Sequence, residues 1–245
     1  MGSIMWERDV AEVYDQTYRA KFEPSVLDPI VDLLAGLAGG GPALEFAVGT
    51  GRVALPLSAR GIAVHGLELS SHMAAQLRAK PGADAVPVTI GDMTTTRVAG
   101  APFTLVYLVA NTIMNVTTQD DQLAVFANAA AHLESGGCFV VEVAVPQLRR
   151  VPQGETARVF TLDPDHIGIE TLDDIAGQIT WSHHWIQTHG RVVRHSAPYR
   201  YVWPSELDLM AKIAGFRLRD CWQGWDRAPF TSDSQSQVTV FEKLP

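Results

Sequence analysis

Glu45-Phe-Ala-Val-Gly-Thr-Gly-Arg-Val53 lies between two apolar stretches, Ala43-Leu44 and Ala54-Leu55-Pro56-Leu57. This pattern is typical of a glycine-rich turn that leads from a buried strand into a helix. The glycines Gly49 and Gly51 allow a sharp turn and bring backbone N–H groups close to a ligand. The stretch therefore predicts an α/β fold of the doubly wound type, with a nucleoside-containing ligand at the carboxyl edge of its sheet.

The spacing of the glycines alone leaves two cofactors open. Gly49-Thr-Gly51-Arg-Val-Ala54 also satisfies the dinucleotide pattern G-x-G-x-x-G/A. A dinucleotide would place its pyrophosphate over the helix N-terminus, where the carboxylate of Glu45 would repel it. S-Adenosylmethionine carries an ammonium and a sulfonium group instead, which Glu45 can support directly or through neighbouring backbone groups and water. The acid therefore favours S-adenosylmethionine over NAD.

Two further strand ends each deliver an acid to the same edge. Ile62 to Leu67 reads as a second strand followed by Glu68, whose carboxylate can accept hydrogen bonds from both ribose hydroxyls. Val86 to Ile90 reads as a third strand followed by Gly91-Asp92-Met93. Asp92 can accept the adenine amino hydrogen, and Met93 can pack its thioether near the ring. A solvated loop acid explains any one of these residues, but three in order indicate a cofactor site.

With these residues the chain resembles the class I S-adenosylmethionine-dependent methyltransferases over nearly its whole length. Ala47 stands where the commoner turn has its first glycine. Within the class, the chain is most similar to bacterial small-molecule methyltransferases, including those acting on deoxyamino sugars, through Gly66-Leu-Glu-Leu-Ser70, Met73 and Gly91-Asp-Met93. The resemblance implies transfer of the sulfonium methyl to N, O or C of a small molecule in bacterial secondary metabolism. It also adds cofactor-binding residues: Ala47, Leu69, Met73 and Val109.

The order of the elements supports a Rossmann-like sheet of seven strands, mostly parallel with an antiparallel last strand. A helical pattern over Pro24 to Leu37 precedes the first strand, whereas dinucleotide domains commonly begin with the strand. The resemblance makes the two C-terminal strands the sixth and seventh. The later elements are a strand over Phe103 to Ala110, a helix over Asp120 to Leu133 closed by Gly136-Gly137, a strand over Cys138 to Val145, a helix over Pro204 to Ala214, and strands over Phe216 to Trp222 and Val238 to Glu242.

A segment that a bare methyltransferase core does not need, residues 146–200, separates the fifth strand from the last helix. We expect a core made of residues 1–145 and 201–245, and a β-rich insertion that covers the acceptor site or forms a dimer contact. Gln178 to Thr188 alternates between two faces, one with Trp181 and Trp185 and the other with His184, as in a half-buried strand.

The insertion contains a predicted hairpin that brings histidines together. A turn at His189-Gly190 would lead into a second strand, Arg191 to Trp203, and place His184 opposite His195. A slip by one residue would pair His183 with His195 instead.

Five of the eight histidines fall in the insertion, at 166, 183, 184, 189 and 195. One interpretation is a sheet whose histidines are hydrogen-bonded or face solvent. Another is a general base acting on the acceptor, with His184 and His195 as the catalytic candidates. A base of near-normal pKa predicts a rate that rises between about pH 5.5 and 7.5. No metal site is expected, because Cys and carboxylate partners at ligand spacing are missing.

The N-terminal stretch Ala11-Glu-Val-Tyr-Asp-Gln-Thr-Tyr18 resembles a segment of many small-molecule methyltransferases, where an aromatic residue closes over the methionine end of the cofactor. The resemblance assigns Tyr14 to the cofactor and Tyr18 to the acceptor; the alternative is two structural tyrosines in a helix. Asn111 to Asn115 lacks the Asn/Asp-Pro-Pro-aromatic signature, which argues against adenine, cytosine and glutamine-amide acceptors. Deoxyamino-sugar methyltransferases tend to have histidine where Asn115 stands, which weakens the case for an amino-sugar acceptor.

The composition of the chain narrows the possible classes of protein further. The chain has 245 residues, 47% of them hydrophobic and 19% charged, which is ordinary for a globular protein. It has no apolar run of bilayer length and no hydrophobic signal segment at its start, and Cys138 and Cys221 read as reduced core thiols, so a cytoplasmic location is expected. The net charge of −8 without Lys/Arg clusters disfavours nucleic acid. Expected partners are a small-molecule acceptor and a second copy in a homodimer, with neither nucleic acid nor membrane.

Two other functions stay open at this point. One is an S-adenosylmethionine-binding protein of the same fold that regulates or catalyses a different reaction. The other, less favoured, is an NAD-dependent oxidoreductase.

Overall fold

A computed structural model of the chain describes residues 6–100, 102–148, 151–188 and 190–245. Its larger sheet has seven strands, arranged in the order β10-β11-β5-β4-β1-β2-β3. The bounds of these strands are β1 (Ala43–Phe46), β2 (Val64–Glu68), β3 (Val88–Ile90), β4 (Phe103–Leu108), β5 (Leu133–Ala144), β10 (Phe216–Trp222) and β11 (Ser236–Lys243).

The pairing of these strands confirms the predicted Rossmann-like sheet. β1 to β5 pair in parallel, and β11 is antiparallel to both β5 and β10. Alternate residues of β5 enter two hydrophobic clusters on opposite faces, with Val140 in one and Phe139 in the other. A sheet buried on both faces explains why β4 and β5 read as continuous apolar runs.

Helices cover the larger sheet, and their predicted bounds hold to within about two residues, the usual uncertainty of helix ends. The α-helices are α1 (Arg8–Thr17), α2 (Pro24–Ala38), α3 (Ala54–Ala59), α4 (Ser71–Arg78), α5 (Gln119–His132) and α6 (Pro204–Ile213), and the short 3₁₀ segments are η2 (Arg19–Phe22), η3 (Ala83–Ala85) and η4 (Thr112–Asn115). Within the described residues, none of the helices has both the length and the apolarity needed to cross a membrane.

Several strand boundaries differ from the prediction, among them the start of β2 at Val64 instead of Ile62 and the end of β4 at Leu108 instead of Ala110. β5 begins at Leu133, so Gly136 and Gly137, predicted to stop the preceding helix, lie within the strand. Leu133 already pairs with Phe103, and the register then shifts before Cys138 pairs with Leu105, which leaves the glycines in an irregular stretch. β3 begins at Val88, two residues later than predicted.

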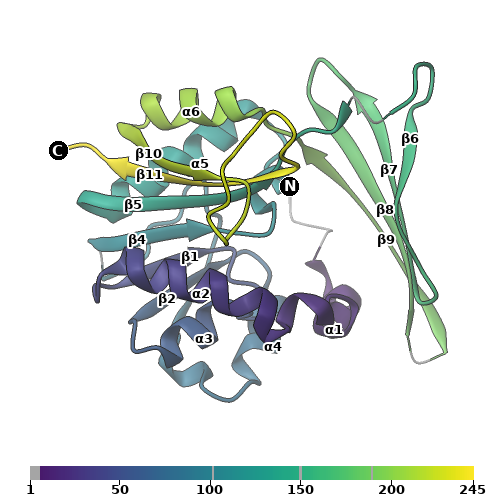
Figure 1. Cartoon of the computed structure of the whole chain (residues 1–245). Coiled ribbons are helices and arrows are strands. Elements are labelled where there is room, and N and C mark those ends of the chain that lie inside the picture. The colour runs from purple at the N-terminus through teal and green to yellow at the C-terminus, as the bar shows by residue number, and fades with distance from the viewer. Residues whose placement is uncertain (1–5, 101, 149–150, 189) are drawn as a thin grey trace.

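The insertion forms a separate four-stranded antiparallel sheet beside the core (Figure 1). Its strands are β6 (Ala157–Asp163), β7 (His166–Asp174), β8 (Ile179–Thr188) and β9 (Arg191–Arg200). The predicted register is confirmed, because His184 pairs with His195 and His183 pairs with Ser196. β9 ends three residues before the predicted Trp203. His189, in the predicted turn, lies outside the described residues.

The two faces of the inserted sheet alternate as predicted, and the polar face of β8 is the more buried one. Thr180, His184 and Thr188 are buried, whereas Trp181 and Trp185 on the opposite face are only half-buried. The polar face packs toward the core, where β9 lies against α1 and η4. His184 therefore points inward, and His183 lies with the two tryptophans on the outer face.

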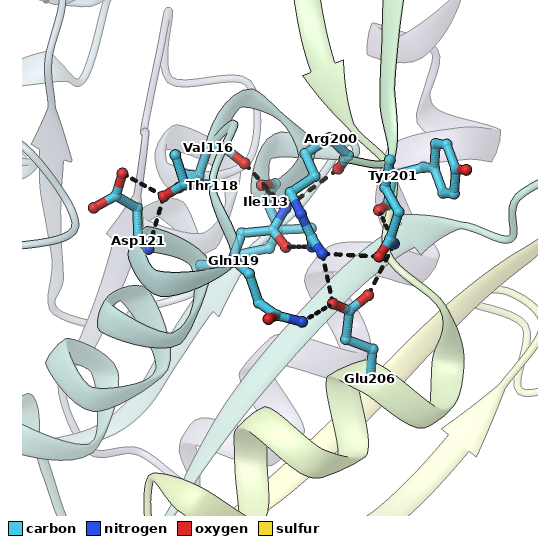
Figure 2. Close-up of polar contacts among 10 residues, drawn as sticks. Ile113, Val116, Thr118, Gln119, Asp121, Arg200, Tyr201 and Glu206 are labelled. Carbon is cyan, nitrogen blue, oxygen red and sulfur yellow. Dashed lines mark hydrogen bonds and ion pairs between the residues drawn. The ribbon is translucent and has the colours of Figure 1, made fainter. Parts of the chain in front are cut away.

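A buried polar network fixes the insertion to the core (Figure 2). Arg200, at the end of β9, donates to Gln122 of α5 at 2.5 Å and to Gln178 at 2.9 Å. It also forms an ion pair with Glu206 of α6 at 2.6 Å. Gln122 is fully buried and Arg200 is 5% exposed, so the arginine charge is compensated inside the protein.

Candidate functional site

The glycine-rich turn after β1 adopts a left-handed backbone at three positions. Ala47 has φ +53°, Gly49 has φ +57° and Gly51 has φ +79°. An alanine in this region pays a steric cost of roughly 1 kcal/mol that glycine avoids. This cost explains why the commoner form of the turn has glycine where Ala47 stands.

The two glycines of the turn serve different purposes. A Cβ added to Gly49 would meet the end of Met73 at 3.5 Å and the Ala47 carbonyl oxygen at 3.9 Å, both ordinary van der Waals distances, so space remains for a ligand beside this residue. A Cβ added to Gly51 would lie 2.9 Å from Leu77 and 3.1 Å from Leu55. Packing against these leucines is one reason for glycine at position 51, and the approach of a ligand to Gly51 stays a prediction.

Glu68, at the end of β2, holds the turn in place. Its Oε2 accepts a hydrogen bond from the Gly49 N–H and its Oε1 accepts one from the Ser70 N–H, each at 2.8 Å. Burial raises the pKa of this carboxyl, and the backbone donors oppose that rise. The Leu69 N–H is a third backbone donor to this carboxylate. Because its two oxygens together offer about four acceptor sites, the carboxylate retains acceptor capacity for the ribose.

Glu45 lies beneath the turn, 3% exposed. It accepts hydrogen bonds from the Tyr107 hydroxyl at 3.0 Å and from the Ala54 N–H. Burial raises its pKa to about 8, against the opposing effects of Tyr107, Arg52 and the Ala54 amide. Since both donors already engage the carboxyl, the geometry favours the indirect support of a cationic ligand, through neighbouring groups, over direct contact.

The other predicted cofactor residues lie along the same edge of the sheet. Asp92 is exposed. Its Oδ1 accepts hydrogen bonds from the N–H and the hydroxyl of Thr94, which leaves Oδ2 for an adenine amino group. Met93 is half-buried, Leu69 is 49% exposed, Met73 is buried beside Gly49, and Val109 is buried just after β4.

The N-terminal segment closes over this edge. Asp15 of α1 accepts a hydrogen bond from the Thr50 hydroxyl at 2.6 Å and forms an ion pair with Lys80. Lys80 also donates to the Thr50 carbonyl at 2.8 Å, and the Ser70 hydroxyl donates to the Trp6 carbonyl at 2.6 Å. These bonds tie α1 and its N-terminal flank to the glycine turn and to the start of α4.

Tyr14 lies where α1 meets the two buried acids. Burial raises the pKa of its phenol; nearby Arg52 opposes this rise, and Asp15, Glu45 and Glu68 add to it. Arg52 donates to the Lys21 carbonyl at 3.4 Å and makes no ion pair with a carboxylate among the described residues. Sequence reasoning missed Arg52, although its position directly after Gly51 could have indicated a cation beside the ligand.

A second polar cluster, also missed from the sequence, lies where β4 and β5 end. The Glu142 carboxylate accepts hydrogen bonds from the Ala110 N–H at 2.7 Å and from the Trp225 indole at 2.9 Å. Ala110 and Asn111 both have positive φ, a strained arrangement that clusters at functional sites. Nothing in the sequence marks Glu142, because the bonds that position it come from distant segments.

Six aromatic rings connect α1 and its flank to the inserted sheet. Tyr14 contacts Trp6 and Tyr18, with ring centroids 5.7 and 4.8 Å apart. The inserted sheet completes a closed chain of contacts. Its links are Tyr18–His166 at 6.4 Å, His166–His184 at 5.1 Å, His184–His195 at 5.8 Å and His195–Trp6 at 6.0 Å.

Burial lowers the pKa of each of the three histidines in this ring of contacts. Burial, together with the neighbouring histidines, lowers the pKa of His184 to about 4. Burial also lowers the pKa of His166 and that of His195. The prediction of a near-normal histidine pKa is therefore wrong for His184, whereas the rise of the rate between about pH 5.5 and 7.5 stays a prediction.

Comparison with known proteins agrees with this geometry. The methyltransferase domain family matches residues 43–137, which include the glycine turn and all three acids. The chain is 24% identical to the cypemycin N-terminal methyltransferase of a Streptomyces species, over 94% of this chain and 98% of that protein.

Two solved structures extend the likeness to the whole chain. The CcbJ methyltransferase of Streptomyces caelestis is 31% identical, with a TM-score of 0.86 and 98% of each chain covered. CalS10, an amino pentose methyltransferase of Micromonospora echinaspora, was solved with bound S-adenosylmethionine and shares the fold at 21% identity, with a TM-score of 0.71, 95% of this chain and 97% of that chain covered. These matches support neither the oxidoreductase nor the non-methylating binding protein. The chain belongs to the S-adenosylmethionine-dependent methyltransferase family.

Proposed function

We propose that this methyltransferase acts on an amine nitrogen of a small natural-product molecule. The observation that carries the proposal is the closure of the cofactor edge by the aromatic chain from α1 and the inserted sheet. An enclosed, aromatic and largely uncharged wall suits a small acceptor bound in its neutral form. The names of two similar proteins support the choice of nitrogen, because one is an N-terminal methyltransferase of cypemycin and the other an amino pentose methyltransferase.

The residues at the sheet edge fit the cofactor in chemical type. We infer that Glu68 binds the ribose hydroxyls, that Asp92 accepts from the adenine amino group beside Met93 and Leu69, and that Gly49 and Met73 line the turn. Arg52 has no ion-pair partner among the described residues, so we assign it to the methionine carboxylate, with Tyr14 beside it. Glu45, Ala47, Gly51 and Val109 support the turn and the base of the site.

S-Adenosylmethionine supplies an electrophilic methyl group when bound. The chain itself contributes placement, since alignment of two reactants is worth on the order of 7–11 kcal/mol. A neutral amine attacks without prior help from a base and loses its proton afterwards. We assign His184 and His195 to the acceptor side of the site, within the insertion of residues 146–200.

The test is a screen of amines for methyl uptake. Purified protein is incubated with trideuteriomethyl-S-adenosylmethionine and a panel of amino sugars, peptides with free N-termini and alkylamines. Mass spectrometry should detect a product heavier by one labelled methyl group, together with S-adenosylhomocysteine. A matched panel of alcohols is the control, and labelling confined to the alcohols would refute the amine assignment.

We also propose a homodimer formed through the outer face of the inserted sheet. The half-buried Trp181 and Trp185 lie on this face with the 41%-exposed Ile167. These three side chains provide an apolar surface that a second copy would cover. Sedimentation velocity should give a dimer for the wild type and a monomer for Trp181→Ser/Trp185→Ser, with the circular dichroism spectrum retained; a monomeric wild type would contradict the proposal.

The free Cys138 and Cys221 thiols support a cytoplasmic location.

A further inference from the structure

Tyr199 lies on the face of β9 that is turned toward the core. It pairs with Thr180 of β8, and Ala197, two residues earlier on the same face, pairs with Ser182. Thr180 and Ala197 are buried, and α1 and η4 are the elements of the core that lie against β9 (Figure 1). Tyr199 itself is half-buried. Its side chain therefore lies between the inserted sheet and the core.

Two tyrosines of the N-terminal segment share this space. Tyr14 and Tyr18 contact each other, with ring centroids 4.8 Å apart. Burial, and after it the nearby Tyr14, raises the pKa of Tyr199 to about 12. Burial, and after it the nearby Tyr199, also raises the pKa of Tyr18. Because such mutual effects weaken with distance, the three phenols lie close together, and we call them the phenol cluster.

The phenol cluster reaches the cofactor edge through Tyr14. Burial raises the pKa of the Tyr14 phenol, and the carboxylates of Glu45 and Glu68 add to this rise, so this phenol lies near both acids. Glu68 also accepts the N–H of Gly49 and is the proposed ribose acceptor. Tyr199 therefore belongs to a wall that begins at the cofactor edge and continues to the inserted sheet.

The three hydroxyls of the phenol cluster are accessible and have no protein partner. None of them makes a hydrogen bond within the part of the chain that the structure describes. In that part, the fully inaccessible side-chain atoms without a partner are Thr180 Oγ1 and His195 Nε2, so the phenol oxygens retain contact with open space. Since Thr180 lies directly across from Tyr199 and is also unbonded, the Tyr199 hydroxyl does not turn back to the sheet. It is available to a ligand.

The phenol cluster is uncharged at neutral pH, because burial raises the pKa of each of its three members. The carboxylate of Asp15, beside Tyr14 on α1, is paired with Lys80. A partly buried wall without charge disfavours an ammonium ion, since burial costs the charged form of a group more than the neutral form. The wall therefore favours an amine in its neutral form, which is the form that carries a lone pair.

We propose that the hydroxyl oxygen of Tyr199 accepts a hydrogen bond from the N–H of the neutral acceptor amine and so turns the amine lone pair toward the transferable methyl group. This inference rests on the proposed amine acceptor. A phenol oxygen has two acceptor lone pairs, and an amine that only donates keeps its own lone pair for attack. A carboxylate in this place would instead stabilise the ammonium form, which has no lone pair. Tyr199 is thus a catalytic residue supplied by the insertion.

The hydrogen bond to Tyr199 gains strength during the reaction. The amine nitrogen forms a bond to the methyl carbon as the carbon–sulfur bond breaks, and the electron pair of that bond stays on sulfur. The nitrogen becomes positive and keeps its hydrogen, so the product leaves as a methylated ammonium that exchanges its proton with solvent after release. A hydrogen bond from a charged donor is stronger than one from a neutral donor. Because the bond is stronger in the transition state than in the ground state, it raises kcat.

The test is Tyr199→Phe, which removes the hydroxyl and keeps the ring. Methyl transfer is measured on the amine with the highest turnover in the screen. We expect kcat to fall by about 10- to 100-fold, the usual effect of losing a hydrogen bond to a charged group, and KM for the amine to change by less than about fivefold. The affinity for S-adenosylhomocysteine should stay within about twofold of the wild-type value. Tyr201→Phe is the matched control, because the Tyr201 phenol lies near Arg200, Asp174 and Glu206, and its kcat should stay within about twofold.

Several outcomes overturn the role of Tyr199. Amine methylation with wild-type kcat in Tyr199→Phe would refute this role and leave the proposed function in place. A loss of S-adenosylhomocysteine affinity as large as the loss of kcat would also refute it, because Tyr199 would then act on the cofactor. An equal fall of kcat in Tyr201→Phe would assign the effect to packing at the end of β9. A wild type that methylates no amine would refute the proposed function and this inference with it.

Discussion

Glu68→Ala is expected to weaken the binding of S-adenosylhomocysteine by about 30- to 900-fold, which corresponds to about 2–4 kcal/mol. The carboxylate is the proposed acceptor for two ribose hydroxyls, and hydrogen bonds to a charged group are the stronger kind. Its loss also frees the Gly49 and Ser70 N–H groups that now position the turn. Isothermal titration calorimetry of the folded variant gives the affinity directly.

A second ligand and a second variant make this result specific. 5′-Methylthioadenosine keeps the ribose but lacks the methionine carboxylate, so Glu68→Ala should weaken its binding by a similar factor. Arg52→Met is the matched control at the other end of the site. It should weaken the binding of S-adenosylhomocysteine while leaving the affinity for methylthioadenosine within about twofold of the wild-type value. Wild-type affinity for both ligands in Glu68→Ala would mean that the ribose lies elsewhere.

Much of the core could be predicted because its signals are local. Glu68 and Asp92 follow buried strands, and the carboxyl ends of parallel strands meet at one edge whatever the rest of the chain does. The hairpin register was predictable for the same reason, since a two-residue turn and period-2 alternation fix which residues face each other.

The parts that failed depend on contacts between distant segments. The alternation in β8 predicted which residues share a face of the strand. It could not predict which of the two faces is more buried, because that depends on where α1 and η4 pack. The low pKa of His184 comes from burial among residues of three strands, which spacing along one strand cannot reveal. Glu142 is held by Ala110 and Trp225, and Tyr107 reaches Glu45 from a neighbouring strand. The packing of Gly51 against Leu77 could not be predicted either, because Leu77 comes from another helix.

Arg200→Ala is expected to lower the free energy of unfolding by about 3–5 kcal/mol, the usual cost of breaking a buried ion pair. The substitution removes the cationic partner of Glu206 and the Arg200 donor to the buried Gln122 oxygen, at the point where the insertion meets the core (Figure 2). Urea unfolding at about pH 7 measures the change. Arg217→Ala is the matched control, because the exposed Arg217–Glu242 pair should contribute no more than about 1 kcal/mol.

The pH dependence of this loss follows from Glu206. Partial burial alone would raise the pKa of its carboxyl, but hydrogen bonds from Arg200, Gln178 and Gln119 outweigh that effect and lower the pKa below its ordinary value of 4.5. A depressed carboxyl pKa stabilises the folded state above the unfolded pKa, and the stabilisation disappears as the pH falls through the folded pKa. The difference between wild type and Arg200→Ala should therefore be constant from about pH 7 to about pH 5.5 and shrink below about pH 4.5. A difference that stays constant through the acid range would show that Arg200 acts through packing and not through its charge.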